Sequence, residues 1–167
     1  MNAGKWTLVL GGARSGKSRH AEALVMRSPP PWTYVATGQA FDDEMRARIA
    51  AHQAARAPGW VTVEAPLDLP AALAADGPVL VDCLTLWLSN LLLAGRDLEA
   101  AAAALEAALT ARPAPTVLVS NEVGLGIVPD NALARRFRDA AGVLHQRLAA
   151  GAERVVMMVA GIPLQVK

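Results

Sequence analysis

The feature that most restricts the fold of this 167-residue chain is a glycine-rich turn between an apolar run and a helical pattern. The run Trp6–Leu10 is apolar apart from one threonine and ends on two glycines, as expected of a buried strand that enters a turn. From Lys17 to Met26 the apolar residues are spaced as in a helix. Between them, Gly11–Ser18 reads GGARSGKS and matches the pattern G-x-x-x-x-G-K-[S/T]. A strand, this loop and a helix, in that order, are typical of the P-loop that binds nucleoside triphosphates.

Each part of this loop has a chemical role. Its glycines allow successive backbone N–H groups to point at phosphate oxygens, and the following helix adds the positive end of its dipole. The Lys17 ammonium neutralises charge on the outer phosphates, and the Ser18 hydroxyl is a ligand for Mg²⁺. We therefore predict that phosphate is bound by Gly11, Gly12, Ala13, Arg14, Ser15, Gly16, Lys17 and Ser18.

The rest of the chain alternates between strand and helix patterns, which favours an α/β fold. We expect strands at Trp6–Leu10, Trp32–Ala36, Trp60–Glu64, Val79–Asp82, Thr116–Ser120 and Val155–Ala160, with a short one at Leu164–Val166. Helices are expected at Lys17–Met26, Asp42–Arg56, Leu69–Ala75, Leu84–Leu93, Leu98–Ala111 and Ala132–Ala149, and a loop at Asn121–Asn131. The strands are apolar throughout, so both of their faces should be buried in a mostly parallel sheet covered by helices. The prediction is a three-layer, RecA-like P-loop sandwich, with residues 1–167 as a single domain.

Composition argues against several other classes of protein. An apolar content of 53% and a net charge of +1 are unlike a disordered chain or an electrostatic binder of nucleic acid. The single cysteine, Cys83, cannot support a disulfide scaffold. The longest nearly apolar stretch, Cys83–Gly95, falls short of the roughly 18–20 residues of a membrane span. Because the N-terminus also lacks the pattern of a signal peptide, we expect a cytoplasmic protein without a membrane span or a nucleic-acid partner.

A magnesium-dependent phosphate site needs an acidic residue besides the P-loop serine. Asp82 ends the apolar run that begins at Val79, so it should lie at the carboxyl end of a strand, where ligands bind in open α/β sheets. We predict that Ser18 and Asp82 hold Mg²⁺ together. Glu122 follows the next expected strand in the same way and is a second candidate. For both acids, the alternative is an ordinary polar residue where a strand meets solvent.

Of the three histidines, His52 has the most unusual surroundings in the sequence. On the expected helix, Arg48 lies four residues before it and Arg56 four residues after it. Neighbouring cations keep an imidazole neutral and therefore nucleophilic, and arginines can hold phosphates for attack. The spacing alone equally allows a partly exposed helix histidine. For His20 and His145 we expect no chemical role.

Six segments, in order along the chain, point to one family. They are GGARSGKSRHAE from Gly11, YVATGQ from Tyr34, DDEMRARI from Asp42, VDCLT from Val81, SNEVGLGIVP from Ser120 and GIPL from Gly161. Together they resemble the bifunctional adenosylcobinamide kinase/adenosylcobinamide-phosphate guanylyltransferase of cobalamin biosynthesis. The resemblance extends over essentially the whole chain, and the segments from Asp42 and Ser120 are far more specific than a P-loop alone.

The resemblance implies two reactions and their participants. A nucleoside triphosphate, ATP or GTP, first phosphorylates the hydroxyl of adenosylcobinamide. A histidine then attacks the α-phosphorus of GTP, and the guanylylated enzyme passes GMP to adenosylcobinamide phosphate, which gives adenosylcobinamide-GDP. This histidine corresponds to His52, which together with Lys17 forms the implied catalytic pair. The resemblance also implies a homotrimer with its active sites near subunit interfaces, and a cleft beside the P-loop that binds cobinamide.

The nucleotide contacts that the resemblance implies extend beyond the P-loop. They map onto Ala36, Thr37, Gly38, Gln53, Ala54, Ala55, Arg56, Glu64 and Asp82. The chain departs from some relatives in two places. Ala51 stands where a second histidine can precede His52, and Gln53–Ala55 replace Lys-Asp-Gly, which makes Arg56 the firmer assignment.

Two other functions fit parts of the sequence. One is a P-loop kinase for another small molecule, which would need no His52. The other is a RecA-type nucleotide-binding or motor module, which would need nucleic-acid loops and a more basic surface. The sequence also leaves open how one P-loop serves attack at both the γ- and the α-phosphorus: either the nucleotide shifts or the second helix moves.

Overall fold

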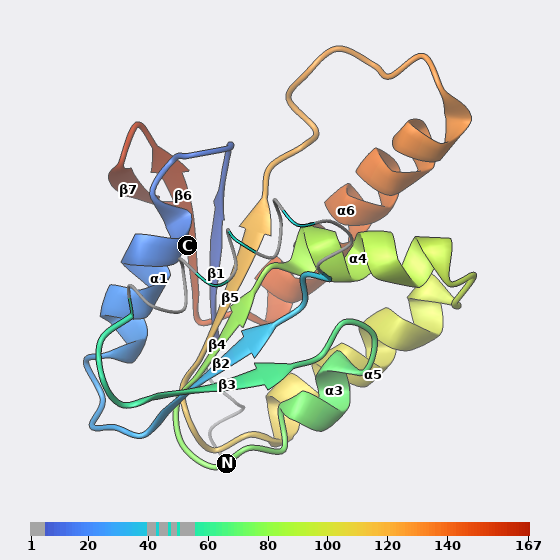
Figure 1. Ribbon diagram of the computed structural model, residues 1–167. Helices are drawn as coiled ribbons and strands as arrows, with labels where there is room; N and C mark the ends of the chain where they lie inside the picture. The colour runs from blue at the N-terminus through green and yellow to red at the C-terminus, as the bar shows by residue number, and fades with distance from the viewer. Residues whose placement is uncertain (1–5, 40–42, 44–46, 48–49, 51–55) are drawn as a thin grey trace.

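The computed structural model of the protein describes residues 6–39, 43, 47, 50 and 56–167. Its strands form one seven-stranded sheet in the order β3-β2-β4-β5-β1-β6-β7, parallel except for β7 (Figure 1). The strands are β1 (Trp6–Gly11), β2 (Trp32–Ala36), β3 (Trp60–Glu64), β4 (Val79–Asp82), β5 (Thr116–Asn121), β6 (Arg154–Val159) and β7 (Ile162–Gln165). The helices are α1 (Lys17–Val25), α3 (Leu69–Ala72), α4 (Leu84–Leu93), α5 (Leu98–Ala111) and α6 (Ala132–Gly151).

The sheet separates two helical layers, which confirms the predicted three-layer α/β fold. Helix α1 lies on one face, and α3, α4, α5 and α6 lie on the other (Figure 1). Consecutive residues of β1 show how both faces are used: Leu8 packs in the core under α4–α6, Val9 packs in the core under α1, and both are fully buried. Among the described residues, no helix is long and apolar enough to cross a membrane.

The expectation that the strands are buried on both faces fails for the two edge strands, β3 and β7. Strand β3 has a neighbour on one side only, and Val61 is 54% exposed. Strand β7 begins two residues earlier than predicted, because Ala160 and Gly161 turn the chain with positive φ angles and reverse its direction. The helix predicted at Leu69–Ala75 also ends early, at Ala72. Much of the helix predicted from Asp42 lies outside the described residues.

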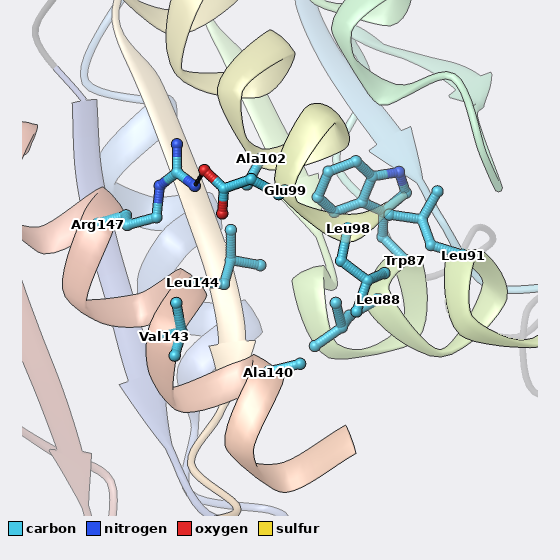
Figure 2. A pocket seen from close by; sticks show the side chains of 10 residues that line it. All are labelled: Trp87, Leu88, Leu91, Leu98, Glu99, Ala102, Ala140, Val143, Leu144 and Arg147. Atoms are coloured by element: carbon cyan, nitrogen blue, oxygen red, sulfur yellow. Dashed lines mark hydrogen bonds and ion pairs between the residues drawn. The ribbon is translucent and has the colours of Figure 1, made fainter. Parts of the chain in front are cut away.

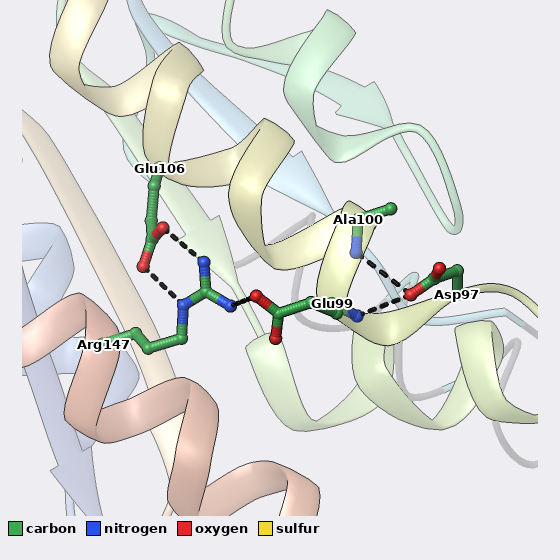
Figure 3. A network of polar contacts seen from close by, with 5 residues as sticks. All are labelled: Asp97, Glu99, Ala100, Glu106 and Arg147. Atoms are coloured by element: carbon green, nitrogen blue, oxygen red, sulfur yellow. Dashed lines mark hydrogen bonds and ion pairs between the residues drawn. The ribbon is translucent and has the colours of Figure 1, made fainter.

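Helices α4, α5 and α6 pack on one another around an apolar cavity of about 160 Å³ (Figure 2). Trp87 of α4 and Leu144 of α6 line it and are both buried. At its end, Arg147 of α6 bridges to two carboxylates of α5 (Figure 3). It binds Glu106 through two bonds of 2.8 and 2.7 Å and Glu99 through one of 2.5 Å. The hydrogen bonds with Arg147 lower the pKa of Glu106. Glu99 is exposed, and Arg147 and Glu106 are only half-buried, so the ion pairs add little to stability.

A buried arginine joins α5 to the segments that precede two strands. Arg112 is 6% exposed and follows the last residue of α5. Its guanidinium donates to the backbone oxygens of Leu73, of Ala75 (2.7 Å) and of Gly77 (2.6 Å), and to Thr116 Oγ1 (2.9 Å). The bonds to Leu73 and Thr116 are buried and those to Ala75 and Gly77 are partly buried, so one side chain satisfies four acceptors that have little access to water.

We expect Arg112→Met to lower the free energy of unfolding by about 3 kcal/mol, because it leaves the buried oxygen of Leu73 and the partly buried oxygens of Ala75 and Gly77 without their donor. For a chain of this length this corresponds to a melting temperature lower by about 6–12 °C. Differential scanning calorimetry would measure it, with the exposed Arg96→Met as the matched control. Equal melting temperatures for the two variants would contradict the assigned role of Arg112.

Candidate nucleotide-binding site

The glycine-rich loop that follows β1 has backbone φ angles that residues with a side chain rarely adopt. Gly11 has φ +155° and Gly16 has φ +92°, both in the region that favours glycine. A methyl group on Gly11 would lie 2.6 Å from Ser15 Oγ and 2.8 Å from the backbone oxygen of Met158. Gly161 N donates to the backbone oxygen of Ser15 at 3.1 Å. The loop is therefore held against β6 and the turn that follows it.

Lys17 lies folded back within this loop. It is the first residue of α1, is 8% exposed, and donates from Nζ to the backbone oxygen of Gly12 at 2.5 Å. Burial lowers the pKa of Lys17, while electrostatic interactions with Cys83 and Asp82 act in the opposite direction. Its ammonium is thus placed beside the backbone groups that the motif predicts to bind phosphate.

The structure brings together the two residues predicted to hold magnesium. Ser18 Oγ donates to Asp82 Oδ2 at 3.3 Å, and Tyr34 Oη donates to the same carboxylate oxygen at 2.5 Å. A hydroxyl and a carboxylate are the hard oxygen ligands that Mg²⁺ prefers. The described part of the chain holds no group of three or more His, Cys, Asp or Glu side chains that could form a complete metal cage. The pair fits a magnesium ion whose other ligands are phosphate oxygens and water.

The ends of three parallel strands lie side by side at this edge of the sheet. Ala36 is in register with Glu64 on one side and with Asp82 on the other. The next residue, Thr37, is fully buried, and its hydroxyl donates to Cys83 O and accepts from Cys83 N. Thr37 N donates to Asp82 O, and Thr37 O accepts from Asn90 Nδ2. All polar atoms of Thr37 thus have protein partners, so this predicted nucleotide contact fixes the strand ends.

Arg56, the one of the predicted contacts Gln53–Arg56 that lies among the described residues, lies over an aromatic ring. Its Cζ is 3.2 Å from the centroid of the Tyr34 ring, and its Nη1 donates to Thr62 Oγ1 at 3.0 Å. Its Nε is buried and has no hydrogen-bond partner among the described residues. The other predicted residues of this region, Arg48, His52, Gln53, Ala54 and Ala55, lie outside the described residues.

Tyr34 is the site residue to which the sequence analysis gave no role. Two signals in the sequence could have pointed to it. It is the only tyrosine of the chain, and it lies two residues before Ala36, on the same face of the same strand. A tyrosine in an otherwise apolar buried strand needs a partner for its hydroxyl.

Glu122 is close to the P-loop through its backbone. Its N–H donates to the backbone oxygen of Gly11 at 3.0 Å, and its Oε1 accepts from Gly124 N at 2.5 Å. The carboxylate is thereby engaged with its own loop. Farther along this loop, Leu125 and Ile127 are 85% and 97% exposed.

His145 is buried in the helical layer. Its Nε2 lies 2.7 Å from Ser120 Oγ at the end of β5, and burial lowers the pKa of its imidazole. A neutral histidine with a hydroxyl partner is consistent with a structural role.

Comparison with known proteins gives a consistent result. The family described as cobinamide kinase/cobinamide phosphate guanyltransferase matches residues 7–166. The chain is 50% identical over 166 residues to the bifunctional adenosylcobalamin biosynthesis protein CobP of Pseudomonas aeruginosa, with 96% of each chain covered. It is 46% identical over 179 residues to the corresponding protein CobU of Salmonella typhimurium, covering 96% of this chain and 98% of that one.

A solved structure supports the fold alone. The flagellar accessory protein FlaH from Methanocaldococcus jannaschii superposes with a TM-score of 0.54, at 11% sequence identity. The match covers 99% of this chain and 79% of FlaH.

The loop geometry predicts different effects of a methyl group at two adjacent glycines. Gly11→Ala should lower the free energy of unfolding by about 1–3 kcal/mol, because the methyl group meets Ser15 and Met158 and the φ angle is unfavourable. Gly12→Ala is the matched control, since no atom lies within 4 Å of its added carbon. Urea denaturation without nucleotide measures both, and a Gly11 variant as stable as the control would rule out this geometry.

Proposed function

Because the chain belongs to the cobinamide kinase/cobinamide phosphate guanyltransferase family, we propose that this enzyme phosphorylates adenosylcobinamide and then transfers GMP to the phosphorylated product. The observation that carries the proposal is the convergence of Lys17, Ser18 and Asp82 beside the glycine-rich loop, at the carboxyl edge of a parallel sheet. This is where open α/β sheets bind their ligands.

In the kinase reaction, the substrate hydroxyl oxygen bonds to the γ-phosphorus of ATP or GTP, and the bond from that phosphorus to the β-phosphate oxygen breaks. The hydroxyl proton is released to solvent. Catalysis of phosphoryl transfer consists mainly of positioning and charge stabilisation. Backbone N–H groups of Gly11–Ser18 and the Lys17 ammonium supply both. We assign to Ser18 and Asp82 the binding of Mg²⁺, which when bound neutralises charge on the phosphates.

In the second reaction, we assign the nucleophile to a ring nitrogen of His52. It bonds to the α-phosphorus of GTP, and pyrophosphate leaves. A phosphate oxygen of adenosylcobinamide phosphate then takes the GMP, which gives adenosylcobinamide-GDP and frees the histidine. A covalent intermediate divides a transfer between two bulky partners into two simpler displacements. To Arg56, four residues after His52 in the sequence, we assign a role in holding phosphate, because its guanidinium lies over Tyr34 and its Nε has no described partner.

The remaining nucleotide contacts and the assembly belong to the same proposal. Further contacts would come from Ala36, Gly38, Gln53, Ala54, Ala55 and Glu64, while the fully buried Thr37 would hold its two neighbours in place. Ala36, Glu64 and Asp82 lie in register, which supports grouping them. We further propose that residues 1–167 form one domain, and that the enzyme is a cytoplasmic homotrimer. Exposed aliphatic side chains such as Ile127 support a contact with another subunit or a substrate.

Replacement of the proposed nucleophile should separate the two reactions. His52→Ala should abolish incorporation of label from α-labelled GTP into the protein, because no phosphoramidate can form, while most of the kinase activity remains. The label on the wild-type enzyme should be acid-labile and base-stable. His20→Ala is the matched control, and it should retain labelling.

Two results would change the assignment. Label that persists in His52→Ala would place the nucleophile elsewhere. A wild-type enzyme that phosphorylates but never takes up label would instead support a small-molecule kinase without guanylyl transfer.

Lys17→Ala should impair both reactions by about 100-fold, since both use the same phosphate-binding loop. The kinase step and GMP transfer are assayed separately, and the melting temperature is recorded to detect unfolding. Arg27→Ala, which removes an exposed cation at the end of α1, serves as the control. If only one of the two reactions slowed in Lys17→Ala, a shared loop would be excluded.

A further inference from the structure

One aromatic side chain connects the proposed metal ligands to the arginine beside the proposed nucleophile segment. Tyr34 lies in the middle of β2, between β4, which carries Asp82, and β3, which carries Thr62. Resting on the function proposed above, we propose that Tyr34 is a positioning residue that holds the Asp82 carboxylate and the Arg56 guanidinium in one fixed arrangement.

The hydroxyl end of Tyr34 fixes the carboxylate. Tyr34 is 3% exposed, and its Oη donates to Asp82 Oδ2 at 2.5 Å, the oxygen that also accepts from Ser18 at 3.3 Å. Both donors reach the same oxygen, so the rotation of the carboxylate is determined before any ligand binds.

The ring of Tyr34 fixes the guanidinium. Arg56 Cζ lies 3.2 Å from the ring centroid, a distance at which a cation and an aromatic face attract each other. Thr62 is in register with Tyr34 on the neighbouring strand, and its Oγ1 accepts from Arg56 Nη1. Trp60 meets the Tyr34 ring edge-on, with centroids 6.0 Å apart and planes at 81°. The guanidinium is thus held by a ring that is itself packed.

The two contacts have different consequences for the two reactions. A tyrosine has few rotatable bonds, so its ring and hydroxyl keep a fixed separation. The proposed kinase reaction depends on the metal carboxylate, whereas guanylylation depends on the carboxylate and on Arg56. Loss of the hydroxyl should therefore change the magnesium dependence of both reactions, and loss of the ring should harm guanylylation most.

Two substitutions at Tyr34 separate these roles. Tyr34→Phe keeps the ring and should raise the Mg²⁺ concentration for half-maximal activity about fivefold in both reactions, because Asp82 loses one fixed donor. At saturating Mg²⁺ its rates should return to within about twofold of wild type. Tyr34→Leu also removes the ring and should slow guanylylation about tenfold more than phosphorylation, even at saturating Mg²⁺.

Thr62→Val is the matched control for the Arg56 end. It removes the hydroxyl that accepts from Arg56 but leaves Tyr34 and Asp82 in place. It should slow guanylylation without changing the magnesium midpoint. Melting temperatures of all three variants show whether any loss is a loss of folded protein.

The proposal has a readout that does not require turnover. Magnesium-dependent binding of a fluorescent GTP analogue should show the same fivefold shift in Tyr34→Phe. An unchanged magnesium midpoint in Tyr34→Phe, or a parallel loss of both reactions in Tyr34→Leu, would reduce Tyr34 to core packing and overturn the inference. Failure of the wild-type enzyme to catalyse either reaction would refute the proposed function instead, and the binding measurement would still decide the role of Tyr34.

Discussion

The parallel alignment of the central strands is the constraint on which the site depends. Gly11 pairs with Asn121, and Asp82 pairs with Ala36, across strands that all run in one direction. Because parallel strands present their carboxyl ends at one edge, residues far apart in sequence arrive there together. The antiparallel β7 lies at the opposite end of the sheet order from β3 and does not disturb this convergence.

Opposite charges lie close together at this edge but are arranged for different partners. Lys17 is directed at a backbone oxygen of its own loop, whereas Asp82 accepts from two hydroxyls. Burial of Lys17 costs solvation of its charge, and a bound polyphosphate would restore a favourable partner. This arrangement supports the proposal that a polyphosphate anion and a cation bind here together.

The sequence predicted which segments form strands and helices better than it predicted how the strands are ordered in the sheet. The loop Gly11–Ser18 and the alternation of strands with helices follow from residue spacing within short segments, and both appear in the structure. The strand order does not follow from such spacing, so the exposed position of β3 was missed. Tyr34 on β2 contacts Asp82 on the neighbouring β4 and Arg56, which precedes β3, so these contacts depend on the strand order. The roles assigned to individual site residues, His52 above all, stay predictions.

The buried guanidinium of Arg112 has a consequence for how substitutions in this protein would act in a living cell. Arg112 binds the segments that lead into β4 and β5, at the edge of the sheet away from the glycine-rich loop. A lesion there leaves the chemical groups of the site intact and acts on how many molecules remain folded. Modest losses of stability can change the abundance of a protein several-fold through chaperones and proteases. A genetic screen for loss of activity would thus recover substitutions near both ends of the parallel strands. Only substitutions near the carboxyl ends would change the turnover of each molecule that remains folded.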